Sequence, residues 1–538
     1  MKLKKLLCIL SVLALLAAAF AGCSRNAETT GETGSDAQTS ASPDAGQQNM
    51  PPDGQGGPEG APPDGQPPEW GSGDFPDGQP PEGGPGGTPP DGQGGHGGPG
   101  GQEGHGGGHG GPGGQGGHDG GHGGPGGQGG PDGGSPDVDY AGATQITEAA
   151  DLSSQLYESD TADESALIIS TGEAVRLTDL TVNKTGSSNG GDSCSFYGLN
   201  AALLVKDGAQ AEITGGSVTS DANGGNAIFC YGGIGGRNGA EGDGTTLIIR
   251  DTKIVTTGDG SGGIMTTGGG VTQAYELDVE TSGRSSAAIR TDRGGGTVTV
   301  EGGSFVTNGL GSPAIYSTAE IRVKNAELSS NLSEGVVIEG KNSVELTDCT
   351  LTADNTKCNG NAAFLDSVMI YQSMSGDAAS GTSAFTMTGG SLTSKSGHVF
   401  HVTNTSAVIT LSGVSIVNED KENVLLSVCA DGWQGAGNTA AVKAIGQELE
   451  GAIKVGSDST LNLELTEASS FTGLIDGSIT NAKGETVSAE TGSVTVTLDG
   501  TSTWTLTGDS WITALNGSTE NIHLNGYTLY VDGQPLQG

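Results

Sequence analysis

The side chains best suited to chemistry in this sequence are arginines, carboxylates and aromatic residues in the second half of the chain. The densest group is the tetrapeptide from Arg290 to Arg293, which includes Asp292. Guanidinium and carboxylate groups can hydrogen-bond sugar hydroxyls, and aromatic faces can stack on sugar rings. We therefore expect an exposed stripe that binds polysaccharide or another cell-surface ligand. Its expected ligand-binding residues are Tyr231, Arg290, Asp292, Arg293, Tyr316, Tyr371, Gln372 and His401.

Two other roles stay open for these side chains. Inserted loops can cover the stripe, in which case its residues only pack, and the arginines simply neutralise neighbouring acidic segments. Alternatively, Arg290, Asp292 and Arg293 are the catalytic residues of a polysaccharide lyase or glycosidase. We favour binding over catalysis, because we find no fuller set of catalytic residues in the sequence than these three. A structural spacer without a ligand is a third possibility.

A repeat of short strands must position these side chains. Alternating segments such as 297–307 and 384–394 share a strand, a glycine turn and a second strand. The apolar residue after the turn recurs mostly every 23 to 26 residues, with three longer steps that we interpret as loop insertions. These marker residues are Leu180, Val218, Ile254, Val279, Phe305, Leu328, Leu351, Leu392 and Ile416. A period of this length predicts a solenoid, whereas a sandwich of hairpins, the alternative, predicts steps of about 8–12 residues.

Alternation along another strand of each repeat assigns side chains to the inside or the outside of the solenoid. The expected inward column is Ile228, Ile264, Ile289, Ile315, Val337, Phe400 and Leu425. The expected outward column is Phe229, Met265, Arg290, Tyr316, Ile338, His401 and Leu426. An interior built from single inward side chains is consistent with an aromatic content of only 4%.

The repeat resembles a known fold family. Segments such as 261–270, 285–303, 311–321 and 333–346 resemble the coils of bacterial surface lipoproteins and adhesin-like proteins with the pectin-lyase-like fold. The resemblance implies an all-β, single-stranded right-handed parallel β-helix over residues 138–538, with the last coils and a cap from about residue 460. Polygalacturonase-like members carry NTD, DD and GHG motifs, and residues 138–538 contain none of them.

A low-complexity segment precedes this body. Residues 24–137 hold 42 of the 101 glycines and 19 of the 21 prolines. PPDGQ-like motifs recur over 51–93, and HGGPGGQ recurs every 13 residues from His96. Such a composition cannot bury enough apolar surface to fold, so we expect residues 23–137 to be a disordered tether. Its five histidines offer a further, less favoured possibility of binding a transition metal.

The first residues have the pattern of a secretory signal. Lys2, Lys4 and Lys5 precede an apolar run that ends in Phe20-Ala21-Gly22-Cys23. This ending resembles the lipobox of bacterial lipoproteins, which implies a signal peptide over 1–22 and lipidation of Cys23. A plain secretory signal is the alternative. The expected location is the extracellular face of the cell membrane, with attachment through the lipid.

Charge and cysteine content limit the partners. The net charge of −41 argues against nucleic acid, which clustered Lys and Arg bind. No cofactor is evident; the GDG segments at 242–244 and 258–260 leave Ca²⁺ as a weaker possibility, although EF-hand and RTX patterns are missing. We expect a monomer. The remaining cysteines, which lack zinc-site spacing, are expected to be free interior residues, with one disulfide as the alternative. They are Cys194, Cys230, Cys349, Cys358 and Cys429.

Overall fold

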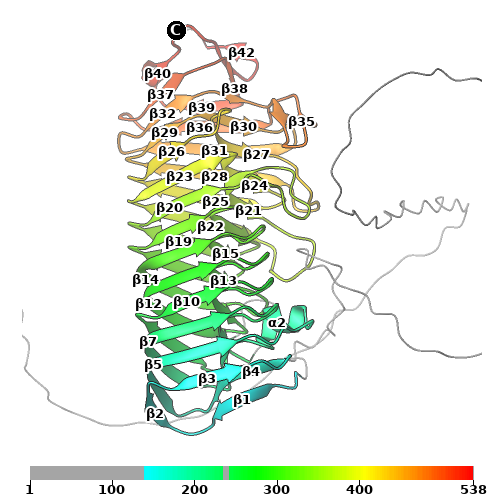
Figure 1. Cartoon of the computed structure of the whole chain (residues 1–538). Coiled ribbons are helices and arrows are strands. Elements are labelled where there is room, and N and C mark those ends of the chain that lie inside the picture. The colour runs from blue at the N-terminus through cyan, green and yellow to red at the C-terminus, as the bar shows by residue number, and fades with distance from the viewer. Residues whose placement is uncertain (1–137, 234–240, 537–538) are drawn as a thin grey trace, which may run out of the picture. The chain divides into compact units, whose positions relative to one another are not determined.

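The computed structural model describes residues 138–233 and 241–536. The expected signal peptide, Cys23 and the tether therefore lie outside the described residues. The described part is nearly all β, and its long parallel sheets run along a stack of coils (Figure 1). This is the arrangement of a β-helix solenoid, which the repeat predicts. Its only helices are the short α2 (Asp192–Tyr197) and the 3₁₀ turn η1 (Thr519–Asn521).

One sheet of 13 parallel strands, called sheet A here, runs along the whole stack. Each coil contributes one short strand. In order along the stack the strands are β1 (Ala141–Ile146), β4 (Glu164–Ser170), β6 (Leu203–Lys206), β8 (Ile228–Tyr231), β11 (Ile264–Thr267), β13 (Ile289–Thr291), β15 (Ile315–Ser317), β18 (Val336–Glu339), β21 (Asp366–Tyr371), β24 (His398–Thr403), β27 (Val424–Val428), β30 (Ala452–Val455) and β33 (Ile475–Asp476).

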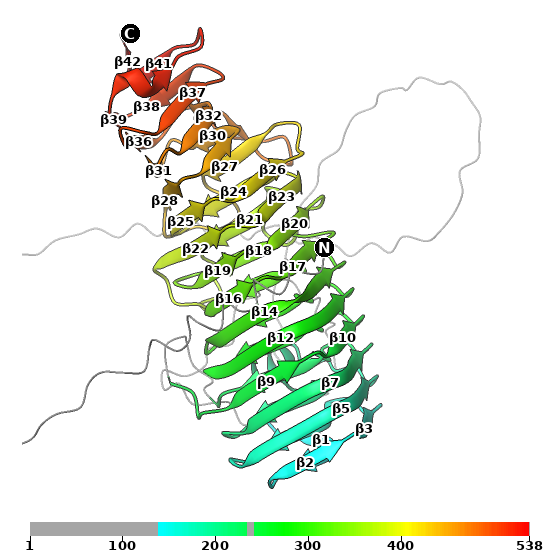
Figure 2. The ribbon, with the colours of Figure 1, turned by 90° about the vertical axis from the view of Figure 1, so that its left-hand side faces the viewer.

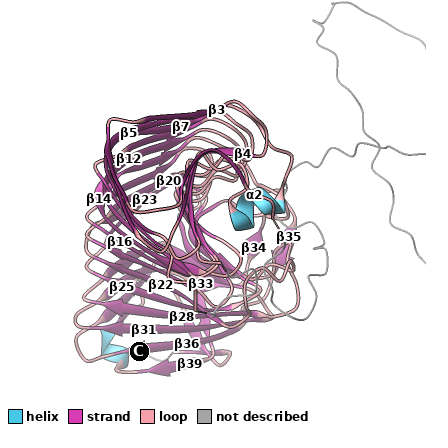
Figure 3. Cartoon of the chain, turned by 90° about the horizontal axis from the view of Figure 1, so that it is seen from below, coloured by secondary structure: helices cyan, strands magenta, loops and turns pink. Residues whose placement is uncertain are grey.

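A second sheet of 20 strands, called sheet B, forms the other walls of the coils (Figures 2 and 3). Its first ladder contains β2 (Ala150–Ser153), β5 (Ala174–Lys184), β7 (Gln210–Ser220), β9 (Thr246–Arg250), β12 (Gly270–Thr281), β14 (Gly296–Thr307), β16 (Glu320–Lys324), β19 (Ser343–Thr347), β22 (Thr382–Thr388), β25 (Ser406–Ser412), β28 (Asn438–Ile445), β31 (Ser459–Thr466), β36 (Ser493–Leu498) and β39 (Ala514–Asn516). The second ladder shares β5, β7, β12 and β14 and adds β3 (Leu156–Ser159), β10 (Lys253–Thr256), β17 (Glu327–Ser330), β20 (Thr350–Asp354), β23 (Ser391–Ser396) and β26 (Ser415–Asn418).

Three small sheets complete the C-terminal end. A four-stranded sheet consists of β29 (Glu448–Glu450), β32 (Ser470–Gly473), β37 (Thr503–Leu506) and β40 (Ile522–His523). A hairpin pairs β34 (Ile479–Thr480) with β35 (Thr486–Ser488), and a last sheet consists of β38 (Ser510–Ile512), β41 (Leu529–Val531) and β42 (Gln534–Pro535).

The glycine, asparagine and aspartate turns of the repeat are the corners between the two ladders of sheet B. The corner residues all have positive φ; they are Asp179, Gly215, Asp251, Glu276, Gly302, Asn325, Asp348, Gly389 and Gly413. Glycine and, less readily, Asn and Asp tolerate this conformation, and eight of these nine corners are Gly, Asn or Asp; the ninth is Glu276. The next position is also crowded: a Cβ on Gly216 would lie 2.0 Å from the carbonyl oxygen of Leu180. The turn chemistry therefore sets where each coil bends.

A continuous apolar core fills the coils from Ile146 to Leu529. The column of marker residues is confirmed from Val218 to Ile416, but Val182, not Leu180, is in register with Val218. The inward column of sheet A is also confirmed over four coils, from Ile228 to Ile315. All five cysteines of the described part are free, and only Cys358 is not fully buried.

Two members of the expected inward column of sheet A are one residue out of register, although one of them, Leu425, still belongs to the main core. Val336, not Val337, is in register with Ile315, and Leu426, not Leu425, is in register with Phe400. Ile338 and Leu426, which we expected to point outward, belong to the main core. The first error arises because β18 contains three consecutive apolar residues, so polarity does not alternate and cannot show which side chain points inward. The second arises at a register shift between Val424 and Leu426.

A ladder of buried serines ties adjacent coils together. The Ser286 hydroxyl accepts a hydrogen bond from the Ser261 backbone N–H at 2.9 Å and lies 3.1 Å from the Gly258 carbonyl oxygen, and the Ser286 N–H in turn reaches the Ser312 hydroxyl at 2.9 Å. We expect Ser286→Ala to lower the free energy of unfolding by about 1–3 kcal/mol, because a buried N–H loses its acceptor. Denaturant titration checks this, with the exposed Thr350→Ala as control; equal losses in both variants would contradict it.

Candidate functional site

Residues of the expected binding stripe are in register on adjacent strands of sheet A, but they do not form an exposed surface. Arg290 is in register with Met265 and Tyr316, and His401 with Met369. Loops cover the stripe, as the packing alternative anticipated. Six of the expected ligand-binding residues are buried: Tyr231, Asp292, Tyr316, Tyr371, Gln372 and His401. The side chains of Arg290 and Arg293 are only 12% and 24% exposed.

The cover consists of α2 and several loops that lie against the outer face of sheet A (Figure 1). α2 packs its Phe196 and Tyr197 against Phe229 and Met265. Further along, Trp433 packs against Tyr371 with ring centroids 4.8 Å apart. α2 and the loop after β21 lie in long steps of the repeat, and the loop that contains Trp433 follows β27, after the last marker residue Ile416.

One ion pair fastens the cover, and a second ion pair lies beneath it. Arg290 bonds Asp292, with Nε 3.1 Å from Oδ2, and its guanidinium lies 5.2 Å from the centre of the Tyr316 ring. Arg293 bonds Asp377 of the cover and lies 4.2 Å from the Phe196 ring centre. Burial raises the pKa of Asp292 to about 6, and the positive charge of Arg290 opposes the shift. The charged groups of these side chains therefore bond to one another or to the cover, inside the protein.

Two tyrosines and a glutamate form the centre of this covered cluster. The hydroxyls of Tyr316 and Tyr371 both reach Glu339 Oε2, the second at 3.0 Å. Gln372 donates to the carbonyl oxygen of Ala378 at 3.3 Å, inside the same loop. Sequence reasoning missed Glu339, Asp377 and Trp433, because nothing in a strand pattern indicates which loop folds over which coil.

His401 belongs to a second buried cluster. Its Nδ1 lies 2.8 Å from Ser427 Oγ, and its Nε2 lies 3.5 Å from Asp431 Oδ2. The same hydroxyl lies 2.7 Å from Nδ1 of His398, whose pKa burial lowers to about 3. Serine, histidine and carboxylate in contact can activate a nucleophile. Here the serine and His401 are fully buried, and the Phe364 ring stacks on His401 at 4.5 Å, so no substrate reaches the hydroxyl.

A buried carboxyl beside this cluster makes stability depend on pH. Burial raises the pKa of Asp366 well above its usual value, and Glu334 and Asp431 add to the shift. The folded chain then holds a proton that the unfolded chain releases above about pH 4, so the free energy of unfolding falls as pH rises. We expect Asp366→Asn to be more stable than the parent by about 1–3 kcal/mol at pH 8 and to lose most of this gain at pH 5. Denaturant titrations at both pH values test this, with exposed Glu448→Gln as control; a gain that does not depend on pH would contradict the assignment.

The structure assigns no metal site to these groups. Within residues 138–233 and 241–536, no group of three His, Cys, Asp or Glu side chains is placed to hold a metal ion. In the two GDG segments, Asp243 accepts hydrogen bonds from Thr245 and Asp259 accepts one from the Arg284 N–H. The described residues also include no helix long and apolar enough to cross a bilayer.

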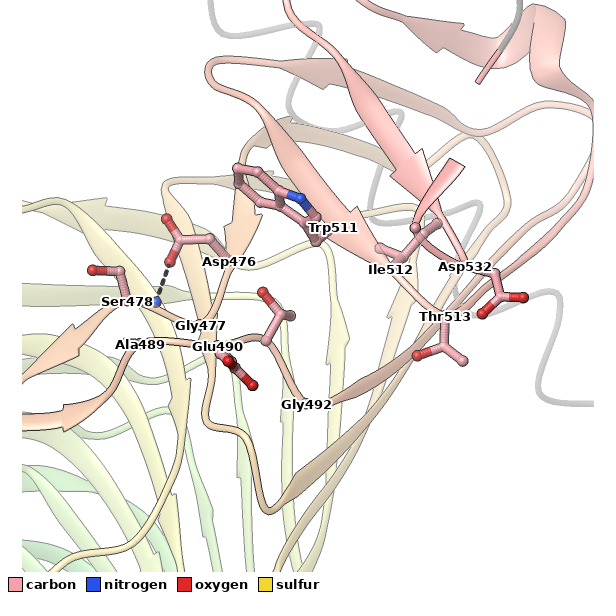
Figure 4. Close-up of a pocket in the computed structure, with 12 residues that line it drawn as sticks. Asp476, Gly477, Ser478, Ala489, Glu490, Gly492, Trp511, Ile512, Thr513 and Asp532 are labelled. Atoms are coloured by element: carbon pink, nitrogen blue, oxygen red, sulfur yellow. Dashed lines mark hydrogen bonds between the residues drawn. The ribbon is translucent and has the colours of Figure 1, made fainter. Parts of the chain in front are cut away.

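An open groove lies elsewhere, at the C-terminal end of the stack (Figure 4). Its volume is about 580 Å³. Sheet A ends there with the two-residue strand β33, after which the chain leaves the coil as the β34–β35 hairpin. The groove forms between this hairpin region and β38 of the last sheet. It is lined by Asp476, Gly477, Ser478, Ala489, Glu490, Thr491, Gly492, Trp511, Ile512, Thr513, Asp532 and Gly533.

Trp511 is the main aromatic surface of the groove. β38 and β41 are parallel, with Trp511 in register with Tyr530. Their rings stack with an interplanar angle of 5° and centroids 5.4 Å apart. The indole is nevertheless 41% exposed, the largest exposure of any described tryptophan. Figure 4 shows it between Asp476 on one side and Thr513 and Asp532 on the other.

Backbone contacts hold the walls of the groove in place. The Ser510 hydroxyl accepts a hydrogen bond from the Ile475 N–H at 3.1 Å, which joins β38 to β33. Gly477 and Glu490 lie close together in the lining, because Gly477 has no side chain: a Cβ on Gly477 would lie 2.0 Å from the Glu490 carbonyl oxygen. The Trp511 groove, defined by these lining residues, is therefore part of the folded end and not a gap between loose loops.

Sequence reasoning missed this groove, although one signal was present. In Ser510-Trp511-Ile512 the neighbours of the tryptophan are buried and the tryptophan points outward, as period-two alternation requires. Comparison of the chain with family models, curated proteins and solved structures finds no match.

Proposed function

We propose that this protein is a lipid-anchored extracellular surface protein whose right-handed β-helix binds polysaccharide through the Trp511 groove. The observation that carries the binding proposal is the exposed Trp511 ring, stacked on Tyr530 at the edge of a groove lined by hydroxyl and carboxyl groups. Parallel strands joined by crossovers are right-handed in nearly all proteins, which supports the proposed winding.

The chemistry of the lining supports a sugar ligand. An indole face packs against the apolar face of a pyranose, and its rigid ring loses little conformational entropy on binding. Ser478, Thr491 and Thr513 supply hydroxyls that both donate and accept hydrogen bonds. Glu490 and Asp532 supply acceptors. Sugar hydroxyls need this combination of an apolar platform and mixed polar groups.

The position of the groove suits display from a membrane. The chain enters the body at the β1 end, and the groove lies at β33, the last strand of sheet A. Twelve inter-strand steps of about 4.8 Å separate the two ends by roughly 58 Å. A lipid at Cys23 and a Gly/Pro-rich tether over 23–137, both proposals from the sequence, add further reach. The groove then lies at the end of the stack opposite the end that the chain enters.

The proposed enzymatic alternative gains no support from the covered stripe. Arg290 and Asp292 bond each other, and Arg293 bonds Asp377 beneath the loops. A polymer has no path to them while the cover is in place. A structural spacer is the other alternative to binding.

A polysaccharide panel tests the proposal. The full-length chain and its Trp511→Ala variant are applied to immobilised neutral, cationic and anionic polysaccharides, and bound protein is measured. We expect retention of the parent on at least one polysaccharide and loss of that retention in the variant. Retention that survives Trp511→Ala overturns the groove as the site, and no retention on any polymer favours the spacer.

A further inference from the structure

We propose that the Trp511 groove selects cationic amino-sugar chains and rejects polyuronates. This inference rests on the proposed function and names the ligand class for the same groove. Three carboxylate side chains line the groove, from Asp476, Glu490 and Asp532. The lining contains no Lys, Arg or His. The groove is therefore a polar site of one charge sign with an aromatic surface beside it.

Only one of the three carboxylates is neutralised within the protein. Lys454 Nζ lies 2.8 and 2.9 Å from the two oxygens of Asp476, which also accepts the Ser478 N–H. Glu490 and Asp532 are exposed. Across the described residues, no ion pair reaches the carboxylates of Glu490 and Asp532. The hydrogen bonds of these two residues use their backbone atoms: the Asp532 N–H donates to the Ile512 carbonyl oxygen, and the Glu490 carbonyl oxygen accepts from the Ser488 hydroxyl. These two carboxylates are thus available to a ligand.

A protonated amino sugar complements this arrangement. Its ammonium group can approach the carboxylate of Asp532 or Glu490 while the sugar ring lies on the indole. A cation close to an aromatic face gains further attraction from the ring quadrupole. An N-acetylated sugar keeps the stacking but loses the charge interaction, so it should bind more weakly.

A polyuronate meets the opposite situation. Each of its sugars carries a carboxylate, and the groove presents Glu490 and Asp532 without a basic residue in the lining. The net charge of −41 adds a repulsive long-range field around the whole chain. Both effects weaken with added salt, whereas stacking on Trp511 does not.

The test compares three oligosaccharides of equal length against the full-length chain. They are a glucosamine oligomer, its N-acetylated counterpart and a galacturonate oligomer, titrated by calorimetry at about pH 5.5 in low and in high salt. We expect the glucosamine oligomer to bind about tenfold more tightly than the acetylated one in low salt, with a smaller ratio in high salt, and no binding of the galacturonate oligomer.

Charge-removing variants locate the preference. Asp532→Asn and Glu490→Gln should each lower affinity for the glucosamine oligomer about threefold to tenfold and leave the acetylated oligomer unaffected; exposed Glu520→Gln is the matched control. Equal or tighter binding of the acetylated or galacturonate oligomer, or a preference unchanged in both variants, overturns the selectivity while the proposed function stands. Binding that is indifferent to Trp511→Ala overturns both. Binding of no oligomer overturns the selectivity alone if the polysaccharide panel retains the parent, and overturns both if the panel does not.

Discussion

Replacing Trp511 by alanine is expected to weaken polysaccharide binding by about 30-fold or more. An aromatic side chain that a ligand buries on binding can contribute about 2 kcal/mol or more, which corresponds to that ratio of dissociation constants. The indole is the exposed face of a stacked pair, and the alanine methyl leaves the ligand without an apolar platform. Calorimetric titration with the tightest ligand of the polysaccharide panel measures the effect.

The same substitution should leave the fold nearly unchanged. Trp511 is 41% exposed, and its stacking on Tyr530 contributes about 0.5–1.5 kcal/mol. The thermal midpoint should therefore fall by only a few degrees. Tyr527→Ala removes an equally exposed aromatic residue outside the lining and is the control; it should bind as the parent does. Partial recovery in Trp511→Phe would support stacking, and equal losses in the Trp511 and Tyr527 variants would contradict it.

The coils could be predicted from the sequence because their signals are local. A corner such as Gly215-Gly216 needs positive φ, and the strands on either side alternate in polarity. These two features fix the length of each coil and the inward column from Val218 to Ile416. Where the alternation disappears, as in Val336-Val337-Ile338, the assignment slips by one residue.

The cover could not be predicted in the same way, because it depends on contacts between distant segments. Arg293 bonds Asp377, 84 residues away, and Thr267 donates to the carbonyl oxygen of Phe196, 71 residues away. Alternation correctly places Arg290 and Tyr316 outside the coil, but it carries no information on what lies above them. An outward side chain in a solenoid with inserted loops is therefore not the same as an exposed one. The Trp511 groove escapes such loops because sheet A ends beside it.

Replacing Arg290 by alanine is expected to lower the free energy of unfolding by about 3–5 kcal/mol, because it leaves the Asp292 carboxylate buried without its cation. Binding at the Trp511 groove should not change. The loss should shrink on acidification: burial already raises the pKa of Asp292 to about 6, removal of Arg290 raises it further, and a protonated carboxyl carries no unpaired charge. Stability of the variant relative to the parent therefore rises as pH falls from 8 to 5.

A double variant separates the ion pair from the volume of the side chain. Arg290→Met with Asp292→Asn removes both charges and keeps an oxygen that can accept the Arg293 N–H, which bonds Asp292 Oδ1 at 2.9 Å in the parent. Replacing both partners of a buried pair costs far less than removing one. Denaturant titrations should thus find the double variant more stable than Arg290→Ala at pH 8. A double variant as unstable as the single one would mean that Arg290 acts through packing on Tyr316 and not through its charge.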